Sequence, residues 1–223
     1  MFTDFEFLQK VPLFVNISAH DLPTLMSCLS ATIKSYEKDE IIFMAGDPAT
    51  CVGIILSGKA HVQSEDFMGN RTIIAALDEG DLFGESMACA HVEKLPVSVV
   101  ATESCRVMLI DYRKIVSICP SSCSFHSRLI ENMLTIVASK NVILNQKVEI
   151  ISRRSTREKL ITYLSAQAQK AGGSSFTIPF SRQDLADFLC VERSAMSAEI
   201  SKLQRDGMIK TSKNKFELLY GRD

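Results

Sequence analysis

Two parallel apolar stripes run through residues 124–151 and constrain the fold more than any other feature of the chain. Each stripe alternates steps of four and three residues, and the second lies one position before the first. Neighbouring positions on an α-helix are about 100° apart, so the two stripes together form an apolar face too wide for a single contact. We therefore expect one long helix that packs on its own domain with one stripe and on a second copy of the chain with the other.

The stripe assigned to the second copy contains one polar residue, Asn141. A lone polar residue at such a seam fixes register and strand number at some cost in stability. The alternative is a core helix of a monomer, but a helix about 42 Å long exceeds what a small β domain would bury. The predicted dimer interface comprises Ile130, Leu134, Val137, Asn141, Leu144, Val148 and Ile151. The stripe assigned to the helix's own domain comprises Leu129, Met133, Ile136, Lys140, Ile143, Lys147 and Ile150.

The region before this helix has the pattern of an antiparallel β domain. Between residues 18 and 113, short apolar segments are separated at near-regular intervals by Gly46, Gly58, Gly69 and Gly80, and glycine supplies the positive φ of tight turns. Strands are expected at residues 40–43, 52–56, 60–62, 72–76, 97–101 and 105–110. The first 30 residues carry apolar side chains at three and four spacing, which predicts helices against that sheet.

Helix-capping signals divide the region after residue 151. Ser155 and Glu158 form a capping box, and the helix that they open should end at Gly172. After a short strand at residues 176–180, Ser181 and Asp184 form a second capping box that opens another helix.

A helix-turn-helix follows from that second box. The next helix starts near Arg193 and ends at Gly207, with Cys190 at the turn position where glycine is common. Residues 208–211 and 215–219 then form a hairpin across Lys213 and Asn214, in which asparagine is expected to take the left-handed turn position. A basic hairpin directly after the second helix is a wing, so the segment is a winged helix-turn-helix.

Charge is distributed unevenly along the chain. Residues 153–223 hold 13 Lys and Arg against 8 Asp and Glu, a net charge of +5. The totals of 25 basic and 26 acidic residues leave 12 against 18, a net charge of −6, for residues 1–152. The C-terminal third is therefore the part suited to a polyanion.

The outward face of the second helix and the flanking helix N-terminus carry short or cationic side chains. Such side chains can reach base edges and phosphates in a major groove, and helix N-termini bind phosphate. We predict double-stranded DNA as the partner. The expected DNA-binding residues are Ser181, Arg182, Gln183, Arg193, Ser194, Ser197, Lys202 and Lys213.

Several other classes of protein are disfavoured. No stretch approaches the roughly 18 uninterrupted apolar residues that span a bilayer, so we expect a soluble, cytoplasmic protein without a membrane partner. Seven cysteines without CxxC pairs, and four histidines without paired spacing, indicate no metal site. A cupin-type metalloenzyme needs an H-x-H motif that the chain lacks, so no enzymatic activity is expected, and the cofactor is left unknown.

The whole chain resembles the Crp/Fnr family of bacterial transcription regulators. The resemblance is carried by Glu40 to Phe43 with Gly46-Asp47, the segment Gly80 to Glu85, the long helix, and Arg182 to Ile209 as the helix-turn-helix. It implies an α+β fold in which a cyclic-nucleotide-binding-like, jelly-roll type β-roll (1–120) is followed by a dimerisation helix (121–151) and a winged helix-turn-helix (152–223). It also implies a homodimer on a near-palindromic site, with RNA polymerase as a further partner.

The chain departs from cyclic-AMP-binding members of that family at the phosphate clamp. Those members carry an Arg-Ser pair where this chain has Leu95 and Pro96, and leucine cannot replace an arginine fork. We therefore expect an effector other than cyclic AMP, an uncharged or weakly acidic organic molecule. The expected effector pocket comprises Gly84, Glu85, Ser86, Leu95, Pro96, Val97, Ser98, Met133, Ile136 and Lys140.

Two alternatives to an effector-controlled regulator remain. Cys119 and Cys123 lie one helical turn apart and allow a thiol-responsive regulator, whereas an N-terminal iron–sulfur cluster is disfavoured because Cys28 is the first cysteine. The other alternative is a small-molecule-binding interaction module without DNA activity, which would require an inert outer face on residues 193–206.

Overall fold

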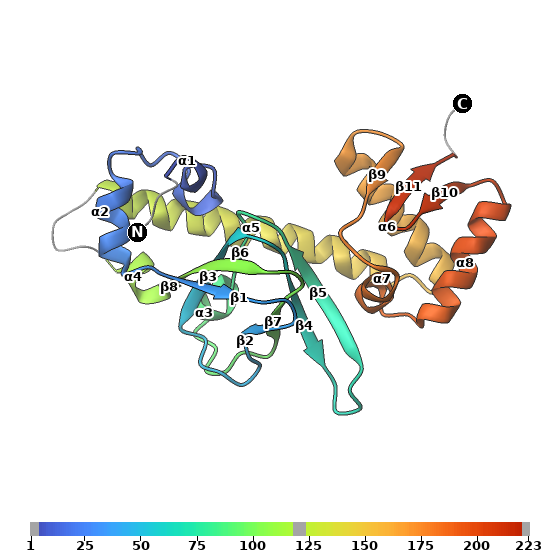
Figure 1. The fold of residues 1–223 in the computed structure, drawn as a ribbon, viewed down its shortest axis with the longest axis horizontal. Helices are drawn as coiled ribbons and strands as arrows, with labels where there is room; N and C mark the ends of the chain where they lie inside the picture. Colours follow the sequence, from blue (N-terminus) through green and yellow to red (C-terminus); the bar gives the residue numbers. More distant parts are fainter. Residues whose placement is uncertain (1–4, 118–123, 220–223) are drawn as a thin grey trace. The chain divides into compact units, whose positions relative to one another are not determined.

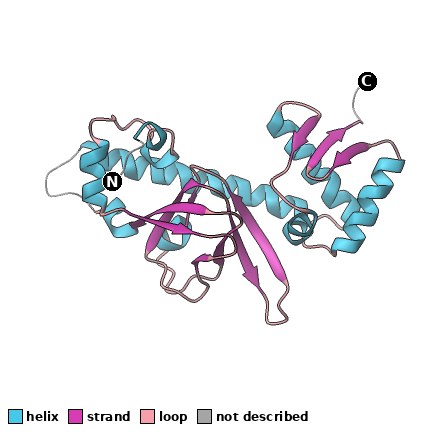
Figure 2. Cartoon of the chain, in the orientation of Figure 1, coloured by secondary structure: helices cyan, strands magenta, loops and turns pink. Residues whose placement is uncertain are grey.

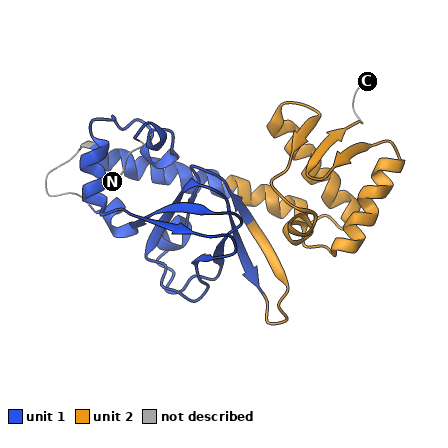
Figure 3. Ribbon diagram, in the orientation of Figure 1, with its two compact units in different colours: residues 1–65, 75–141 blue, residues 66–74, 142–223 orange. Residues whose placement is uncertain are grey.

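The computed structural model describes residues 5–117 and 124–219 (Figure 1). It divides into two compact units, residues 1–65 with 75–141 and residues 66–74 with 142–223 (Figure 3). The chain therefore crosses between the units at three places. The expected α+β class is confirmed (Figure 2). The three-part division at residues 120 and 151 stays a prediction.

Helices open the first unit, as the spacing of apolar residues predicts. The α-helix α1 spans Phe5–Leu8, the 3-10 helix η1 spans Pro12–Phe14, and α2 spans Leu22–Leu29. Ser30 closes α2 in the left-handed conformation with φ of 48°. The apolar side chains of this region are buried in one cluster with parts of the sheet that follows.

Two antiparallel four-stranded sheets make up most of the first unit, with strand orders β1-β8-β3-β6 and β2-β7-β4-β5. All six expected strands are present. Sequence reasoning missed β1, which has little buried surface, and β6, which has two residues. The strands are β1 (Thr32–Tyr36), β2 (Ile41–Phe43), β3 (Cys51–Ser57), β4 (Ala60–Glu65), β5 (Arg71–Leu77), β6 (Leu82–Phe83), β7 (Ser98–Ala101) and β8 (Cys105–Asp111).

Strand β3 is buried on both faces, and its alternate side chains enter two apolar clusters. Val52 and Ile54 pack with the N-terminal helices, while Ile55 packs with the second sheet. A strand covered on both sides reads as a continuous apolar run rather than an alternating pattern, as the segment CVGIIL does. Two short helices complete the unit, α3 (Glu85–Cys89) and α4 (Tyr112–Val116).

The long helix α5 spans Ser124–Ile151, as predicted. In the first unit its residues Leu129, Met133 and Ile136 are buried in the same cluster as the N-terminal helices. The first half of the stripe assigned to the helix's own domain therefore packs there. Ile143 of the same stripe is 61% exposed, and Val137 of the other stripe packs against the cluster, so the predicted division of the two stripes is wrong at these positions.

The second unit contains the winged helix-turn-helix. Both capping boxes are confirmed, at Ser155 with Glu158 and at Ser181 with Asp184, and Gly172 ends its helix with φ of 67°. A three-stranded sheet of order β10-β11-β9 accompanies the helices. The elements are α6 (Thr156–Ala171), β9 (Ser175–Thr177), α7 (Arg182–Leu189), α8 (Arg193–Arg205), β10 (Ile209–Ser212) and β11 (Lys215–Leu218).

Two local expectations in this unit are wrong. In the wing turn the left-handed residue is Lys213, with φ of 53°, because Asn214 is held by hydrogen bonds to the backbone of Ile178. The strand expected at residues 176–180 ends at Thr177, because Phe180 turns into an aromatic cluster with Tyr163 and Phe188. Cys190 does take the strained turn position, with φ of 53°.

Gly53→Ala tests the packing between β3 and β6. A Cβ at residue 53 would overlap the ring of Phe83, which is 1% exposed. Because neither strand can shift without breaking its pairing, we expect a loss of about 1–3 kcal/mol in the free energy of unfolding. Chemical denaturation measures it.

Gly173→Ala is the matched control, because a Cβ there meets no atom within 4 Å. It should change stability by less than about 0.5 kcal/mol. Equal stability of the two variants would contradict the packing that we describe.

Candidate nucleic-acid interface

Helices α7 and α8 bury one face each and leave the outer face of α8 exposed. Ala186, Met196 and Leu203 are fully buried between the elements of this unit. Small Ala186 allows the close approach of the two helices. The side chains predicted to meet DNA on α8, which are Arg193, Ser194, Ser197 and Lys202, are all exposed.

Carboxylates of this region are paired with arginines from outside the two helices. The Arg71 guanidinium lies 2.7 Å from both Asp184 and Asp187 of α7. Arg157 of α6 lies 2.9 Å from Glu199 of α8 and 3.0 Å from Asp206 at its C-terminal end.

This pairing decides the electrostatic character of the outer face. Arg193, Lys202 and Arg205 are exposed, and Glu192 is the exposed acid at the N-cap of α8. With Glu199 and Asp206 neutralised by Arg157, cationic groups dominate the surface of α8. Such a surface attracts a polyanion and repels a basic partner.

The side chains at the start of α7 are already engaged. The Ser181 hydroxyl caps the helix by accepting from the Asp184 backbone N–H at 3.2 Å, and Gln183 Nε2 donates to Asp187 at 2.8 Å. The Arg182 guanidinium donates to Thr211 Oγ1 at 2.9 Å and lies 4.9 Å from the Phe216 ring centroid. Burial lowers the pKa of Arg182. Arg182 thus joins α7 to the wing, while its contact with DNA stays a prediction.

A buried lysine, Lys147, lies in the part of α5 that belongs to the second unit. Its ammonium donates to the backbone carbonyls of Ile73 and Ile74 and lies 4.2 Å from the Phe188 ring centroid. Burial lowers the pKa of Lys147 to about 8, and nearby Cys190 opposes this shift. The lysine therefore holds β5 and α7 to α5 at a cost in desolvation.

The residues predicted to form an effector pocket include a buried ion pair. Lys140 Nζ of α5 lies 2.9 Å from Glu85 Oε1, and the carboxylate is 2% exposed. The same ammonium donates to the Leu82 carbonyl at 2.6 Å. The structure therefore brings Glu85 and Lys140 together, and Met133 and Ile136 lie in the adjoining core.

The segment expected at the phosphate-clamp position is held by backbone hydrogen bonds. Leu95 is 6% exposed, its N–H donates to the Asp47 carbonyl at 2.8 Å, and its carbonyl accepts from Gly46 at 2.8 Å. Ser98 Oγ accepts from the Ala45 N–H at 3.0 Å. Gly84 and Val97 are half-buried, whereas Ser86 and Pro96 are exposed. The apolar side chain of Leu95 is thus held in place by backbone hydrogen bonds of its own residue, while its correspondence to the clamping arginine stays a prediction.

The stripe of α5 predicted to meet a second copy is uncovered within one chain. Leu134, Leu144 and Val148 are 67%, 52% and 51% exposed. Asn141 is exposed as well, and Ile130, Val137 and Ile151 are half-buried. An apolar stripe of this length facing solvent is a feature of an interaction surface.

Sequence reasoning missed three basic residues, Arg71, Lys147 as an anchor, and Arg157. Arg71 and Asp184 are 113 positions apart, so no local pattern connects them. The interruption of an apolar stripe by Lys147 was the one available signal. Cys119 and Cys123, the predicted thiol pair, lie outside the described residues.

Two family models match the chain. Residues 33–122 match the cyclic nucleotide-binding domain, and residues 158–220 match the Crp-like helix-turn-helix domain. Together they cover the β-roll and the winged helix-turn-helix.

Known proteins with similar sequences include one regulator and one channel. The transcriptional activator protein FnrL of Cereibacter sphaeroides is 22% identical over 186 residues, which are 79% of this chain and 71% of FnrL. A Rhodopseudomonas palustris protein named as a potassium channel is 30% identical over 102 residues, which are 46% of this chain. The chain spans about a quarter of that channel protein, 24% of its length.

A solved structure shares the fold. The c-di-GMP-responsive global regulator CLP of Xanthomonas campestris superposes with a TM-score of 0.73 at 16% identity, covering 90% of this chain and 99% of that one. In the described ranges, 5–117 and 124–219, no helix has the length and apolar character to cross a membrane. Nor do those ranges contain a cluster of three metal-ligating side chains.

Lys147→Met tests the buried ammonium through the pH dependence of stability. The ordinary pKa of 10.5 falls to about 8 on folding, so between these values the unfolded chain binds more protons. The wild-type free energy of unfolding should therefore rise with pH through this window, by about 1–2 kcal/mol relative to Lys147→Met. Below pH 8 the cost of burying the charge is present in full.

Chemical denaturation of both proteins at about pH 7.5 and about pH 10 measures this difference. Cys190→Ser in both backgrounds serves as the control, because it removes the thiol near the ammonium. Parallel pH profiles for the two proteins would contradict the burial of a charged lysine.

Proposed function

The chain belongs to the Crp/Fnr family of transcription regulators, and from this premise we propose that it is a homodimeric, sequence-specific DNA-binding regulator controlled by a small effector in its β-roll. The observation that carries the proposal is the outer face of α8. Its cationic and short polar side chains are exposed, while Arg157 neutralises Glu199 and Asp206.

In this mechanism α8 enters the major groove. Arg193, Ser194 and Ser197 approach base edges, and Lys202 and Lys213 approach phosphates. Ser181 and Gln183 present the N-terminus of α7 to the backbone, where amide groups favour an anion. Arg182 supports the wing through Thr211 and Phe216, and its guanidinium contributes positive charge to the same side. Control of transcription then works through RNA polymerase.

Homodimerisation sets the distance between the two copies of α8, one from each protomer. The exposed stripe of α5 supplies a seam of apolar residues interrupted by Asn141, which fixes register in a coiled coil. A two-fold dimer matches a near-palindromic site with half-sites about 34–36 Å apart.

The effector proposal rests on the chemistry around Glu85. Its carboxylate is neutralised internally by Lys140, and Leu95 stands at the clamp position. A cyclic phosphate would therefore meet an apolar side chain instead of an arginine fork, which favours an uncharged or weakly acidic organic effector. Because Lys140 belongs to α5, a ligand that alters the Glu85–Lys140 pair would bias the dimerisation helix, and a coupling of about 1–3 kcal/mol changes DNA affinity about 5- to 150-fold.

Leu144→Glu tests the dimer. A carboxylate at a position 52% exposed in one chain is harmless to the monomer but is buried in the proposed coiled coil. We expect sedimentation to show dimers for the wild type and monomers for the variant. Gln146→Glu adds the same charge about 200° around the helix and should stay dimeric. A monomeric wild type would overturn the proposed assembly.

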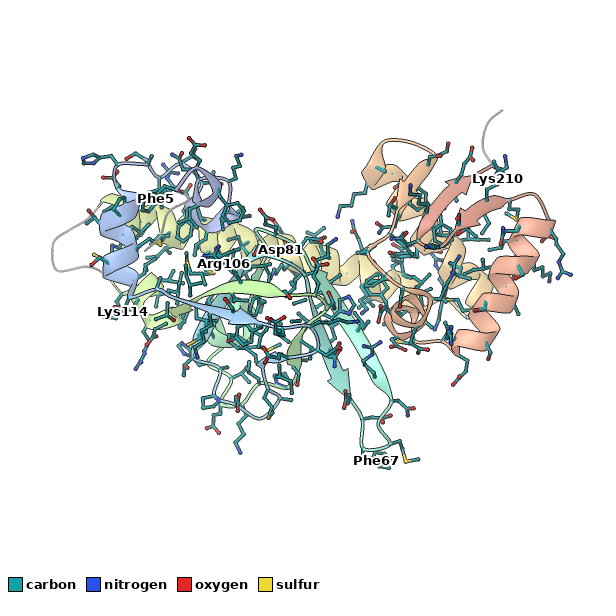
Figure 4. All side chains as sticks on the ribbon, viewed as in Figure 1. Phe5, Phe67, Asp81, Arg106, Lys114 and Lys210 are labelled. Carbon is teal, nitrogen blue, oxygen red and sulfur yellow. The ribbon has the colours of Figure 1, made fainter. Side chains whose placement is uncertain are left out.

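Lys202→Gln tests the phosphate contacts of α8. Loss of one cation should weaken binding to any duplex, about 3- to 10-fold at low salt, and should lower the slope of log affinity against log salt by about 1. Lys114→Gln removes an exposed lysine of α4 in the first unit and is the control (Figure 4). Equal salt slopes for the two variants would count against α8 as the DNA-binding helix. They would favour the alternative of an interaction module without DNA activity.

A further inference from the structure

The segment 66–74, which contains the turn between β4 and β5, belongs to the same compact unit as the helix-turn-helix (Figure 3). We propose that Arg71 of this hairpin is a movable component of the DNA-binding surface. Docked on α7, it neutralises two carboxylates. When Arg71 moves away, Asp184 and Asp187 lose its compensating positive charge and face the DNA phosphates as negative groups. The β-roll thereby controls the charge of the helix-turn-helix surface. This inference rests on the proposed DNA binding.

The ion pairs of Arg71 are partly buried and use two nitrogens of one guanidinium, which is a more specific geometry than most surface ion pairs have. Its Nε donates to Asp187 at 2.8 Å and its Nη2 donates to Asp184 at 2.7 Å, so one guanidinium serves both carboxylates. Arg71, Asp184 and Asp187 are 32%, 22% and 12% exposed. Partial burial reduces solvent screening, and the two-pronged fork cannot be reproduced by lysine.

Hydrogen bonds to the Asp66 side chain hold the turn of the hairpin, which directly precedes Arg71 in the chain. The Asp66 carboxylate accepts from the N–H groups of Met68 and Asn70 at 2.8 and 2.9 Å, and from the Asn70 side chain at 2.8 Å. These hydrogen bonds lower the pKa of Asp66. Phe67 at the tip projects into solvent, 97% exposed (Figure 4). The shape of the turn therefore depends on the hydrogen bonds to Asp66 and not on any packing of Phe67.

Lys147 provides a second anchor for the same segment. Its ammonium donates to the carbonyls of Ile73 and Ile74 while it lies against Phe188 of α7. The hairpin is thus tied to α7 by Arg71 and to α5 by Lys147. The remaining residues of β5, 75–77, belong to the first unit, so a displacement of this strand in the sensor passes to Arg71 through the backbone.

The consequence for DNA binding follows from Coulomb's law. Asp184 lies in the first turn of α7, next to Ser181 and Gln183, which are the residues proposed to approach phosphates. An unpaired carboxylate within a Debye length, about 8–10 Å, of a phosphate weakens binding. Arg71 adds no new base contact in this scheme. It removes a repulsion, and it does so when the β4–β5 hairpin is docked.

A charge-compensation experiment on the full-length protein tests the proposal. The wild type, Arg71→Gln, Asp187→Asn and the double variant are compared for binding to a fluorescent mixed-sequence duplex about three helical turns long at low salt. We expect Arg71→Gln to weaken binding about 5- to 20-fold, and the double variant to recover a large part of that loss. Asp187 is chosen because Asp184 also caps α7.

Two further variants separate charge from structure. Arg71→Lys keeps the charge without the fork and should retain more affinity than Arg71→Gln. Arg106→Gln removes an exposed arginine of β8 and should bind as the wild type does (Figure 4). Hydrogen exchange of β5 and α7 reports docking without DNA and should rise in Arg71→Gln while thermal unfolding shows that the fold persists.

Each outcome decides the proposal. Duplex binding by the wild type that is unchanged in Arg71→Gln overturns the inference and leaves the proposed function intact. Weakened binding that Asp187→Asn does not restore also overturns it, because the effect would then not come from an exposed carboxylate. Absence of duplex binding by the wild type overturns the proposed function, and this inference with it.

Discussion

The structure depends on how the long helix α5 distributes its two apolar stripes. Within one chain, Leu129, Met133 and Ile136 are buried in the core of the first unit, while Leu134, Leu144 and Val148 remain in solvent. Burial of the first stripe stabilises the sensor, and exposure of the second leaves the helix able to pair. In the proposed dimer, a helix that serves both purposes transmits a change in the packing of the β-roll to the interface between the two copies. We propose that this double use couples an effector in the β-roll to the pairing of the helix.

The same helix carries the two lysines that interrupt its buried stripe, and both hold neighbouring elements in place. Lys140 reaches Glu85 and the Leu82 carbonyl in the first unit, and Lys147 reaches the carbonyls of β5 in the second. Replacing either by an apolar residue would extend the core but remove a polar connection. Because burying a charge has a desolvation cost, we propose that these contacts serve mainly to specify one arrangement of the elements.

In the unit that contains the helix-turn-helix, arginines neutralise most of the carboxylates of α7 and α8. Without neutralising partners, the carboxylates of α7 and α8 would make this a surface that binds a polyanion weakly. Arg71 and Arg157 cancel them from outside the two helices, and the exposed cations of α8 then dominate. The net charge of +5 in residues 153–223 does not include Arg71, which brings one further positive charge to α7, although Asp66 balances it within the segment 66–74.

Local features of this protein follow from sequence alone, because they depend on residues a few positions apart. The span of α5, both capping boxes, the left-handed Gly172 and the helix-turn-helix spacing were all predictable from periodicity and capping chemistry. Contacts between distant segments were not. Arg71 meets Asp184 and Asp187, and Lys140 meets Glu85, only because the chain brings them together, and no local pattern distinguishes these basic residues from any other solvated side chain. Even the left-handed residue of the wing turn was decided by the hydrogen bonds of Asn214 to distant Ile178. Sequence determines the elements through short-range propensity, whereas the pairing of charges between elements is decided by the tertiary fold.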